Sequence, residues 1–226
     1  METQGMQDLQ GAQSVQDDLT WREVKTEHIV RDEYIDFRKS DFMMPDGVVY
    51  GPYYTYSRRD YCIIVAVDED GKFLCVRQFR QGIRKVTTEF TAGGIERGDG
   101  KQYRTAYDDR DGYGAVKKSE ADEFASAEDA LDAAKRELRE ETGHESDEWI
   151  HLITIASNAT IADNYAHIYL ALGCRKVSGQ DLDDMEFLNV VKYSKEEIDA
   201  LIREGRFEQA IHVLAWYLAK EQLEKK

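Results

Sequence analysis

The stretch AAKRELREETGHE, residues 133–145, constrains the fold more than any other part of the chain. Its apolar residues recur at helical spacing, and Gly143 follows the last of them, where a helix commonly ends in the left-handed conformation. The same stretch places three glutamates within five residues. Like charges three and four residues apart destabilise a helix by a few tenths of a kcal/mol per pair. The pattern predicts a helix that concentrates negative charge near its C-terminal end.

The three glutamates share one strip of this predicted helix. At about 100° per residue, Glu141 lies about 40° from Glu137 in projection and Glu140 about 60° to the other side. An adjoining apolar strip consists of Leu131, Ala134 and Leu138. The carboxylates therefore lie at the edge of the buried face, and the negative end of the helix dipole adds a second penalty there. We infer a compensating cation, for which oxygen-only ligands suit Mg²⁺ or Mn²⁺. The alternative is a solvated acidic helix end.

Composition limits the remaining possibilities. With 226 residues and 42% hydrophobic residues, the chain forms one domain or one domain with an appendage. A net charge of −15 disfavours nucleic acid and anionic lipid as partners. Three widely spaced cysteines without a CxxC pair indicate neither a zinc site nor a disulfide framework, and therefore a reducing, cytoplasmic setting. We expect neither a signal peptide nor a membrane span.

The order of the patterns predicts a mixed α/β (α+β) fold. Residues 1–18 are a flexible polar N-terminus, 19–58 a β-rich extension, and 59–226 the main domain, whose inserted loop spans 101–124. The central helix is expected from an N-cap at Ser126 to Thr142, followed by two strands and by helices at 195–204 and 207–224.

The central helix resembles a known family motif. RELREETG, residues 136–143, with Glu128 eight residues before Arg136, resembles the second half of the Nudix box, G-x5-E-x7-R-E-U-x-E-E-x-G-U with U apolar. TAGGIERGDG resembles the opening of the box, with Gly93 as its first glycine. An uninterrupted box would place the first glutamate at Asp99. The resemblance therefore implies an insertion of about 25 residues between turn and helix, which costs little loop entropy.

The resemblance extends to one branch of that family, over roughly residues 30–222. DYCIIVAVDEDGKFLCVRQFRQG and TEFTAGGIE, residues 60–82 and 88–96, are similar to the ADP-ribose pyrophosphatase branch of Nudix hydrolases. The resemblance implies the Nudix fold, a mixed β-sheet sandwiched by helices, with an N-terminal antiparallel extension that serves dimerisation and substrate binding. It also implies a homodimer and Mg²⁺-dependent hydrolysis, with Mn²⁺ as a substitute. The reaction would split the pyrophosphate bond of ADP-ribose or a related nucleoside diphosphate sugar into AMP (or another nucleoside monophosphate) and a sugar phosphate.

The matching positions assign metal ligands in this sequence. The resemblance makes Glu137 and Glu141 the principal ligands and Glu140 a further ligand or the catalytic base, with the Ala92 carbonyl completing the site. Bound metals would neutralise the pyrophosphate and lower the pKa of a bound water.

Other positions match substrate-binding and catalytic residues. Arg80 and, more weakly, Arg77 would bind the phosphates, and Glu89 the ribose or the metal shell. In the loop GQDLDDMEF, Asp184 takes the place of the catalytic glutamate and Glu186 that of an additional metal ligand in the catalytic group. The alternatives are surface arginines at a strand end and an ordinary acidic loop.

Three readings of function remain open at this point. The first is the hydrolase, acting on ADP-ribose or on a different substrate such as a GDP-hexose. The second is a non-catalytic nucleotide-sugar sensor, although such domains commonly lose the box carboxylates and all three are present here. The third is an acidic structural protein. The inserted loop 101–124 is expected to be a lid or specificity element.

Overall fold

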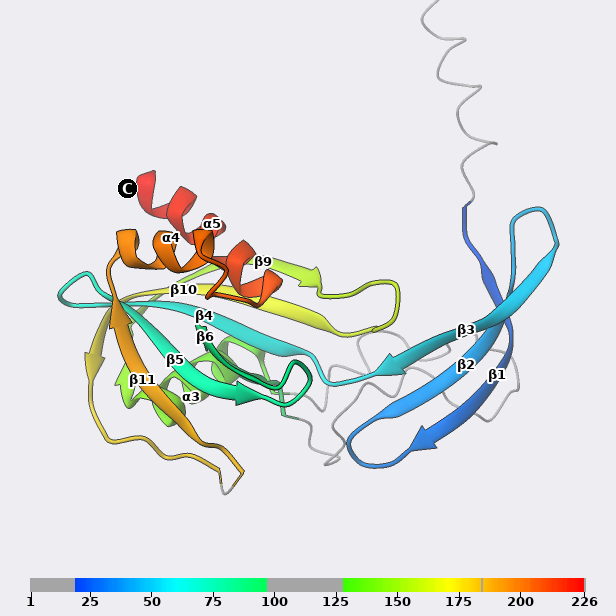
Figure 1. The fold of residues 1–226 in the computed structure, drawn as a ribbon, viewed down its shortest axis with the longest axis horizontal. Helices are drawn as coiled ribbons and strands as arrows, with labels where there is room; N and C mark the ends of the chain where they lie inside the picture. The colour runs from blue at the N-terminus through cyan, green and yellow to red at the C-terminus, as the bar shows by residue number, and fades with distance from the viewer. Residues whose placement is uncertain (1–18, 97–127, 184, 226) are drawn as a thin grey trace, which may run out of the picture.

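The computed structural model describes residues 19–96, 128–183 and 185–225. These residues form two sheets and three helices, the arrangement shown in Figure 1. The elements are β1 (Arg22–Arg31), β2 (Asp36–Met43), β3 (Val49–Ser57), β4 (Tyr61–Asp68), β5 (Phe73–Arg80), β6 (Lys85–Glu89), β7 (Thr91–Gly94), α3 (Ala130–Thr142), β8 (His144–Glu145), β9 (Glu148–Ala156), β10 (Tyr165–Lys176), β11 (Leu188–Tyr193), α4 (Lys195–Arg203) and α5 (Ala210–Glu224). The inserted loop 101–124 and the N-terminal residues 1–18 lie outside the described residues.

The larger sheet is mixed, as the sequence predicts. Its order is β11-β5-β4-β10-β8, with β6 on β5, β7 on β4 and β9 on β10. β4 and β10 are parallel, whereas every other pairing in this sheet is antiparallel. Close to its start, β4 pairs with β7, and close to its end it pairs with β5. The two strands therefore diverge, and the β6–β7 segment lies between them, which brings the glycine turn beside the central helix.

Helices cover both faces of this sheet, which explains why β4 is apolar at almost every position. Ile63 and Val65 pack in a core with α4 and α5, whereas Cys62, Ile64 and Ala66 pack in a second core with α3. Figure 1 shows α3 on one side of the sheet and α4 and α5 on the other. All three cysteines are buried free thiols, and Cys62 and Cys75 belong to the two cores.

The central helix ends where the sequence predicts and begins later. Gly143 has φ 71°, and its N–H donates to the Arg139 carbonyl, so it forms the expected left-handed C-cap. The N-cap, however, is Asp129, whose carboxylate accepts from the N–H of Leu131 at 2.9 Å. The prediction of Ser126 as N-cap is therefore wrong, because an aspartate three residues later caps the first turn. Ser126 itself lies outside the described residues.

The two C-terminal helices are present, and α4 begins at Lys195 as expected. Ser194 caps α4 through a capping box with Glu197, which fixes its first turn. α5 begins at Ala210, three residues after its expected start at 207, because a turn and an irregular segment connect it to α4. Asp199 of α4 accepts hydrogen bonds from Trp216 and Lys220 of α5, so the two helices are joined through polar as well as apolar contacts.

The smaller sheet consists of β1, β2 and β3 in sequence order, all antiparallel, and lies to one side of the larger sheet in Figure 1. It is connected to the main body through β3, which continues into β4, and through the segment between β9 and β10. There the Tyr56 N–H donates to the Ile161 carbonyl at 2.8 Å, and the buried Arg38 contacts both Ser57 and Asp163. Within the described part of the chain, no helix has the length and apolar character needed to span a membrane.

Candidate active site

The glycine turn and the central helix are in direct contact. Gly93, in β7, lies so close to α3 that a Cβ at this position would overlap with the Glu137 carboxylate. A Cβ at Gly94 would likewise overlap with the Arg59 guanidinium. The backbone of the turn approaches acidic and basic side chains at a distance that only glycine permits. The two halves of the predicted motif therefore meet in space although about 40 residues separate them in sequence.

Arg136 holds the acidic side chains together. Its guanidinium donates to Glu137 and to Glu140, both at 2.9 Å, and to both carboxylate oxygens of Glu128 at 3.0 and 3.1 Å. It also donates to the Gly94 carbonyl at 3.1 Å. Arg136 therefore pairs with the acidic side chains and orients them. Burial alone would raise the pKa of Glu128, but Arg136 and the Glu96 N–H hold that pKa below its usual range.

Glu137 and Glu141 are buried with much less compensation. Burial raises the pKa of Glu137 to about 7 against the effect of Arg136, and Glu140 and Glu186 raise it further. The pKa of Glu141 is raised by its burial and then by the charges of Glu137 and Glu186. Its hydrogen bond from the Ala92 N–H, at 3.3 Å, offsets only part of this. Two carboxylates that are costly to ionise therefore lie side by side in a site that is largely shielded from solvent.

The potential ligand atoms at this site are carboxylate and carbonyl oxygens, which suit a hard divalent cation. In residues 19–96, 128–183 and 185–225, no three His, Cys, Asp or Glu side chains already converge as a group that could hold an ion. Arg136 lies among the acidic side chains and supplies part of the positive charge that a metal ion would otherwise supply. Arg136 pairs with Glu137 but makes no ion pair with Glu141 among the described residues, so a cation between these two carboxylates would compensate the charge of Glu141.

Arg80 lies close to these acids and is fixed by a buried carboxylate. Its Nε donates to Glu89 at 2.8 Å, and its charge lowers the pKa of Glu141. Glu89 is fully buried and also accepts from the Thr87 hydroxyl and from the Gln209 amide. Glu89 binds Nε, and the two terminal amino groups of Arg80 make no hydrogen bond to another described residue, so they can bind a phosphate.

His212 completes the surroundings of Glu89. The Phe90 N–H donates to His212 Nδ1 at 3.2 Å, and Nε2 lies 3.7 Å from a Glu89 oxygen. Burial, and then the charge of Arg80, lowers the pKa of His212 to about 3. The imidazole is therefore neutral, with its proton on Nε2 facing Glu89.

Comparisons with known proteins agree with this geometry. No family model matches the chain. The chain is 26% identical over 199 residues to a methanol dehydrogenase activator of Bacillus methanolicus, covering 85% of this chain and 88% of the relative. It is 23% identical over 215 residues to an ADP-ribose pyrophosphatase of Bacillus subtilis (strain 168), covering 91% and 97%. The crystal structure of an ADP compounds hydrolase superposes with a TM-score of 0.69 at 20% identity, covering 92% of this chain and 96% of that one.

In motif, fold and relatives, the chain resembles Nudix hydrolases of the ADP-ribose pyrophosphatase-like branch. The structural match confirms the Nudix fold predicted from the sequence. Identities of 23–26% leave the substrate of this chain to be inferred from its own site.

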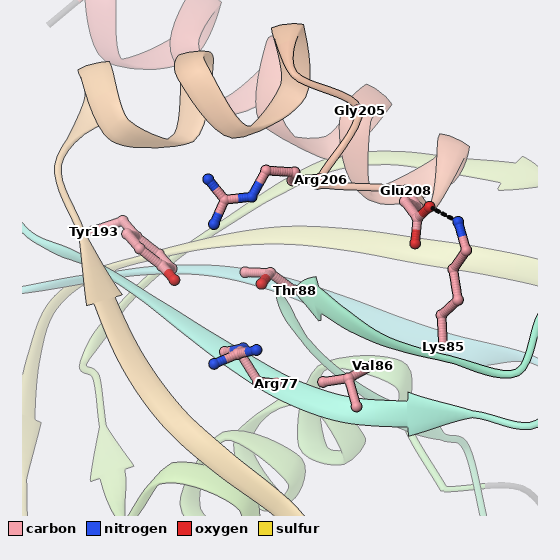
Figure 2. Close-up of a pocket in the computed structure, with 8 residues that line it drawn as sticks. All are labelled: Arg77, Lys85, Val86, Thr88, Tyr193, Gly205, Arg206 and Glu208. Carbon is pink, nitrogen blue, oxygen red and sulfur yellow. Dashed lines mark hydrogen bonds and ion pairs between the residues drawn. The ribbon is translucent and has the colours of Figure 1, made fainter.

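The structure separates the two arginines of the VRQFR segment. Arg80 lies near Glu141, whereas Arg77 lines a different pocket with Tyr193 of β11 and Arg206 of the α4–α5 connection (Figure 2). The arginines are three positions apart, and side chains alternate along a strand, so the two point to opposite faces of the sheet. Arg77 is therefore not brought together with the other predicted site residues.

The acidic loop after β10 reaches the carboxylate site through one of its two predicted residues. The charge of Glu186 raises the pKa of both Glu137 and Glu141, so this side chain lies near the predicted metal ligands. Asp184 lies outside the described residues. The loop is also attached to α3, because the Asp181 N–H donates to the Glu140 carbonyl and the Gln180 amide to the Glu141 carbonyl.

Sequence analysis does not identify two residues that lie against Glu89, namely Gln209 and His212, because neither belongs to a motif. Both follow Glu89 by about 120 residues, so only the tertiary fold brings them to it. No local pattern signals such a contact.

Proposed function

We propose that this chain cleaves the pyrophosphate bond of a nucleoside diphosphate sugar, with ADP-ribose as the first substrate to test. The products would be AMP, or another nucleoside monophosphate, and a sugar phosphate. The observation that carries the proposal is the pair of buried carboxylates, Glu137 and Glu141, near Arg80, whose terminal amino groups bind no other residue in the described part of the chain. A relative named ADP-ribose pyrophosphatase and a matching structure named ADP compounds hydrolase support this substrate class.

Mg²⁺ is the cofactor we propose, with Mn²⁺ as a substitute. Glu137, Glu141 and the Ala92 carbonyl would hold it, and Glu140 and Glu186 would complete its surroundings. When bound, the ion would neutralise the diphosphate and make a bound water more acidic. Arg80 would hold a phosphate through its terminal amino groups, and Glu89 would keep its guanidinium in place. Arg136 would keep Glu137 and Glu140 oriented.

For the base that activates water, we propose Glu140 or Asp184. Glu140 is the most exposed of the three helix carboxylates, with 36% of its side chain accessible, so it can reach a water. Glu186 is the further acidic residue of that catalytic group. A substitution of each, made separately, distinguishes them through the pH profile of turnover.

A second candidate is activation of a partner dehydrogenase. It is favoured by the relative named methanol dehydrogenase activator, which matches 85% of this chain at 26% identity. A protein of this kind would be recognised by a change in the activity of an added dehydrogenase. The three box carboxylates favour hydrolysis over a role as a non-catalytic sensor.

We further propose that the chain is a cytoplasmic homodimer in which the extension 19–58 forms the subunit contact and contributes to the substrate pocket. Aromatic side chains gather on this extension, with Trp21, Phe42 and Tyr53 in mutual contact and Trp21 and Tyr53 partly exposed. Such a cluster is suited to an interface or to stacking on a base. Three buried free thiols agree with a reducing compartment.

One experiment tests the function directly. The purified chain is incubated with a panel of nucleoside diphosphate compounds and Mg²⁺, with and without EDTA, and the products are resolved by chromatography. We expect a nucleoside monophosphate and a sugar phosphate in equal amounts when Mg²⁺ is present without EDTA, and no products when EDTA chelates the metal. Release of inorganic phosphate, or no product from any compound, would exclude the proposed reaction.

A further inference from the structure

A second pocket lies on the face of the sheet away from α3. It has a volume of about 390 Å³ and is formed by β5, β6, the end of β11 and the α4–α5 connection. Figure 2 shows Arg77, Thr88, Tyr193 and Arg206 around it, together with the ion pair between Lys85 and Glu208. The residues that line it include none of the carboxylates of α3 and none of the glycine turn.

The charge of this pocket is opposite to that of the protein. The chain has a net charge of −15, yet the pocket is lined by three cations, Arg77, Lys85 and Arg206, and by one anion, Glu208. Lys85 is paired with Glu208 at 2.7 Å, and Arg206 contacts Glu204 at 3.0 Å through a single amino group. Arg77 has no ion pair or hydrogen bond from its side chain to any other described residue. The positive charge of the pocket is therefore only partly compensated.

The strand register places several hydrogen-bond donors around the same cavity. Arg77 of β5 and Thr88 of β6 are direct register partners, so their side chains lie on the same face. Figure 2 places the Tyr193 and Thr88 hydroxyls on the same side of the ribbon as Arg77, with Arg206 above them. Two guanidinium groups and two hydroxyl groups around one cavity form a donor set that suits a tetrahedral oxyanion.

We propose that this pocket binds the phosphate group of a small molecule, at a site separate from the carboxylate centre. A volume of about 390 Å³ is near the lower end of ligand pockets, which span roughly 300–1,000 Å³. It therefore suits inorganic phosphate or a sugar phosphate rather than a whole dinucleotide. If the proposed function holds, a sugar phosphate is also a product of this enzyme, so the pocket would let a product bind away from the site that makes it.

The test is calorimetric titration of the full chain in EDTA, so that binding does not depend on metal or turnover. The probes are inorganic phosphate, ribose 5-phosphate and, as the uncharged control, ribose. We expect one equivalent of at least one phosphate compound to bind and ribose not to bind. Tighter binding of ribose 5-phosphate would identify a sugar phosphate as the ligand, and equal or tighter binding of inorganic phosphate would identify free phosphate.

Variants locate the binding. Arg77→Gln and Arg206→Gln should each weaken it about tenfold or more, since each removes a charge-assisted donor. Arg203→Gln makes the same charge change three residues away, outside the pocket, and should bind as the wild type does. Arg80→Gln tests the active site and should also leave the affinity unchanged. Unchanged binding in the first two variants, or binding lost only in Arg80→Gln, would overturn the proposal. Because no turnover is measured, these results stand whether or not the proposed reaction is found.

Discussion

Glu89 and Glu141 are both almost completely buried and both lie near Arg80, yet their surroundings differ. Glu89 accepts hydrogen bonds from Arg80, Thr87 and Gln209 and faces a neutral histidine. Among the described residues, Glu141 accepts one long side-chain hydrogen bond, from the Ala92 N–H, and has Glu137 and Glu186 as charged neighbours. A buried charge is retained in a protein when it is paired. The first carboxylate is paired within the chain, whereas the second has partners that repel it.

The difference indicates separate roles. A carboxylate whose acceptor positions are filled by donors of the same chain serves to hold those donors, and Glu89 holds Arg80. A carboxylate that is costly to ionise and crowded by like charge is suited to a ligand that supplies positive charge. Glu141 and Glu137 belong to this second kind. The following predictions test whether the two kinds of carboxylate can be told apart by experiment.

The largest effect is expected at the two carboxylates that are crowded by like charge. Glu137→Gln and Glu141→Gln should each reduce kcat/KM for a nucleoside diphosphate sugar on the order of 10³-fold, because each removes a proposed metal ligand. Asp132→Asn, an exposed position in the first turn of the same helix, is the matched control and should retain activity. Full activity in both glutamine variants would remove the metal assignment.

The same variants give a readout that needs no substrate. Mg²⁺ at about 100 times its dissociation constant should stabilise the wild type by about 2.7 kcal/mol, since an ion that binds only the folded state shifts the unfolding equilibrium. Thermal unfolding measured with Mg²⁺ and with EDTA reports this shift. Glu137→Gln and Glu141→Gln should lose it, and Asp132→Asn should keep it. An equal Mg²⁺ shift in all four proteins would show that the ion binds elsewhere.

Much of this arrangement can be predicted from local sequence. The box residues, the C-cap at Gly143 and the fully apolar strand β4 each leave a signature within a few residues. The N-cap was misplaced because Ser126 and Asp129 are both good caps, and helix ends are the least certain part of such a prediction. The partners of Glu89 could not be predicted, because Gln209 and His212 come from α5, far along the chain.

The separation of Arg77 from Arg80 can be predicted from their spacing on the strand. Residues an odd number apart on a strand face opposite sides of a sheet. If Arg80 faces the substrate, strand alternation alone places Arg77 on the opposite face of the sheet. A sequence motif groups residues by family resemblance, whereas a strand separates them by geometry, and here the pocket in Figure 2 follows the geometry.

The next largest effect is expected at Arg80, the cation that pairs with Glu89. Arg80→Gln should raise KM for the substrate about 10- to 100-fold with a smaller change in kcat, because it removes a charge-assisted contact to phosphate. It should also lower the thermal stability, since it leaves Glu89 buried without its cation. Arg77→Gln is the control on the same strand and should leave KM unchanged. Equal effects of the two substitutions on KM would show that the pockets are not separate.

Gly93 tests the contact between turn and helix. Gly93→Ala would place a methyl group where the Glu137 carboxylate lies, so the turn or the helix must shift. Such overpacking costs about 1–3 kcal/mol, measurable by denaturant unfolding, and should reduce the affinity for Mg²⁺ as well. Gly82→Ala is the control, because a Cβ there meets nothing within 4 Å. Equal stability of both variants would contradict the close approach.

The smallest effect is expected at His212 and depends on pH. In the folded chain its pKa is about 3, whereas an unfolded histidine has a pKa near 6.5. Between these values the unfolded state binds a proton that the folded state does not, so stability falls as the pH falls. From pH 6.5 to 5 this amounts to about 2 kcal/mol. His212→Asn keeps an acceptor for the Phe90 N–H but cannot titrate, so its unfolding free energy should vary less over this window. Equal slopes for the two proteins would mean that this imidazole takes up its proton without unfolding, and that Glu89 binds it as a cation.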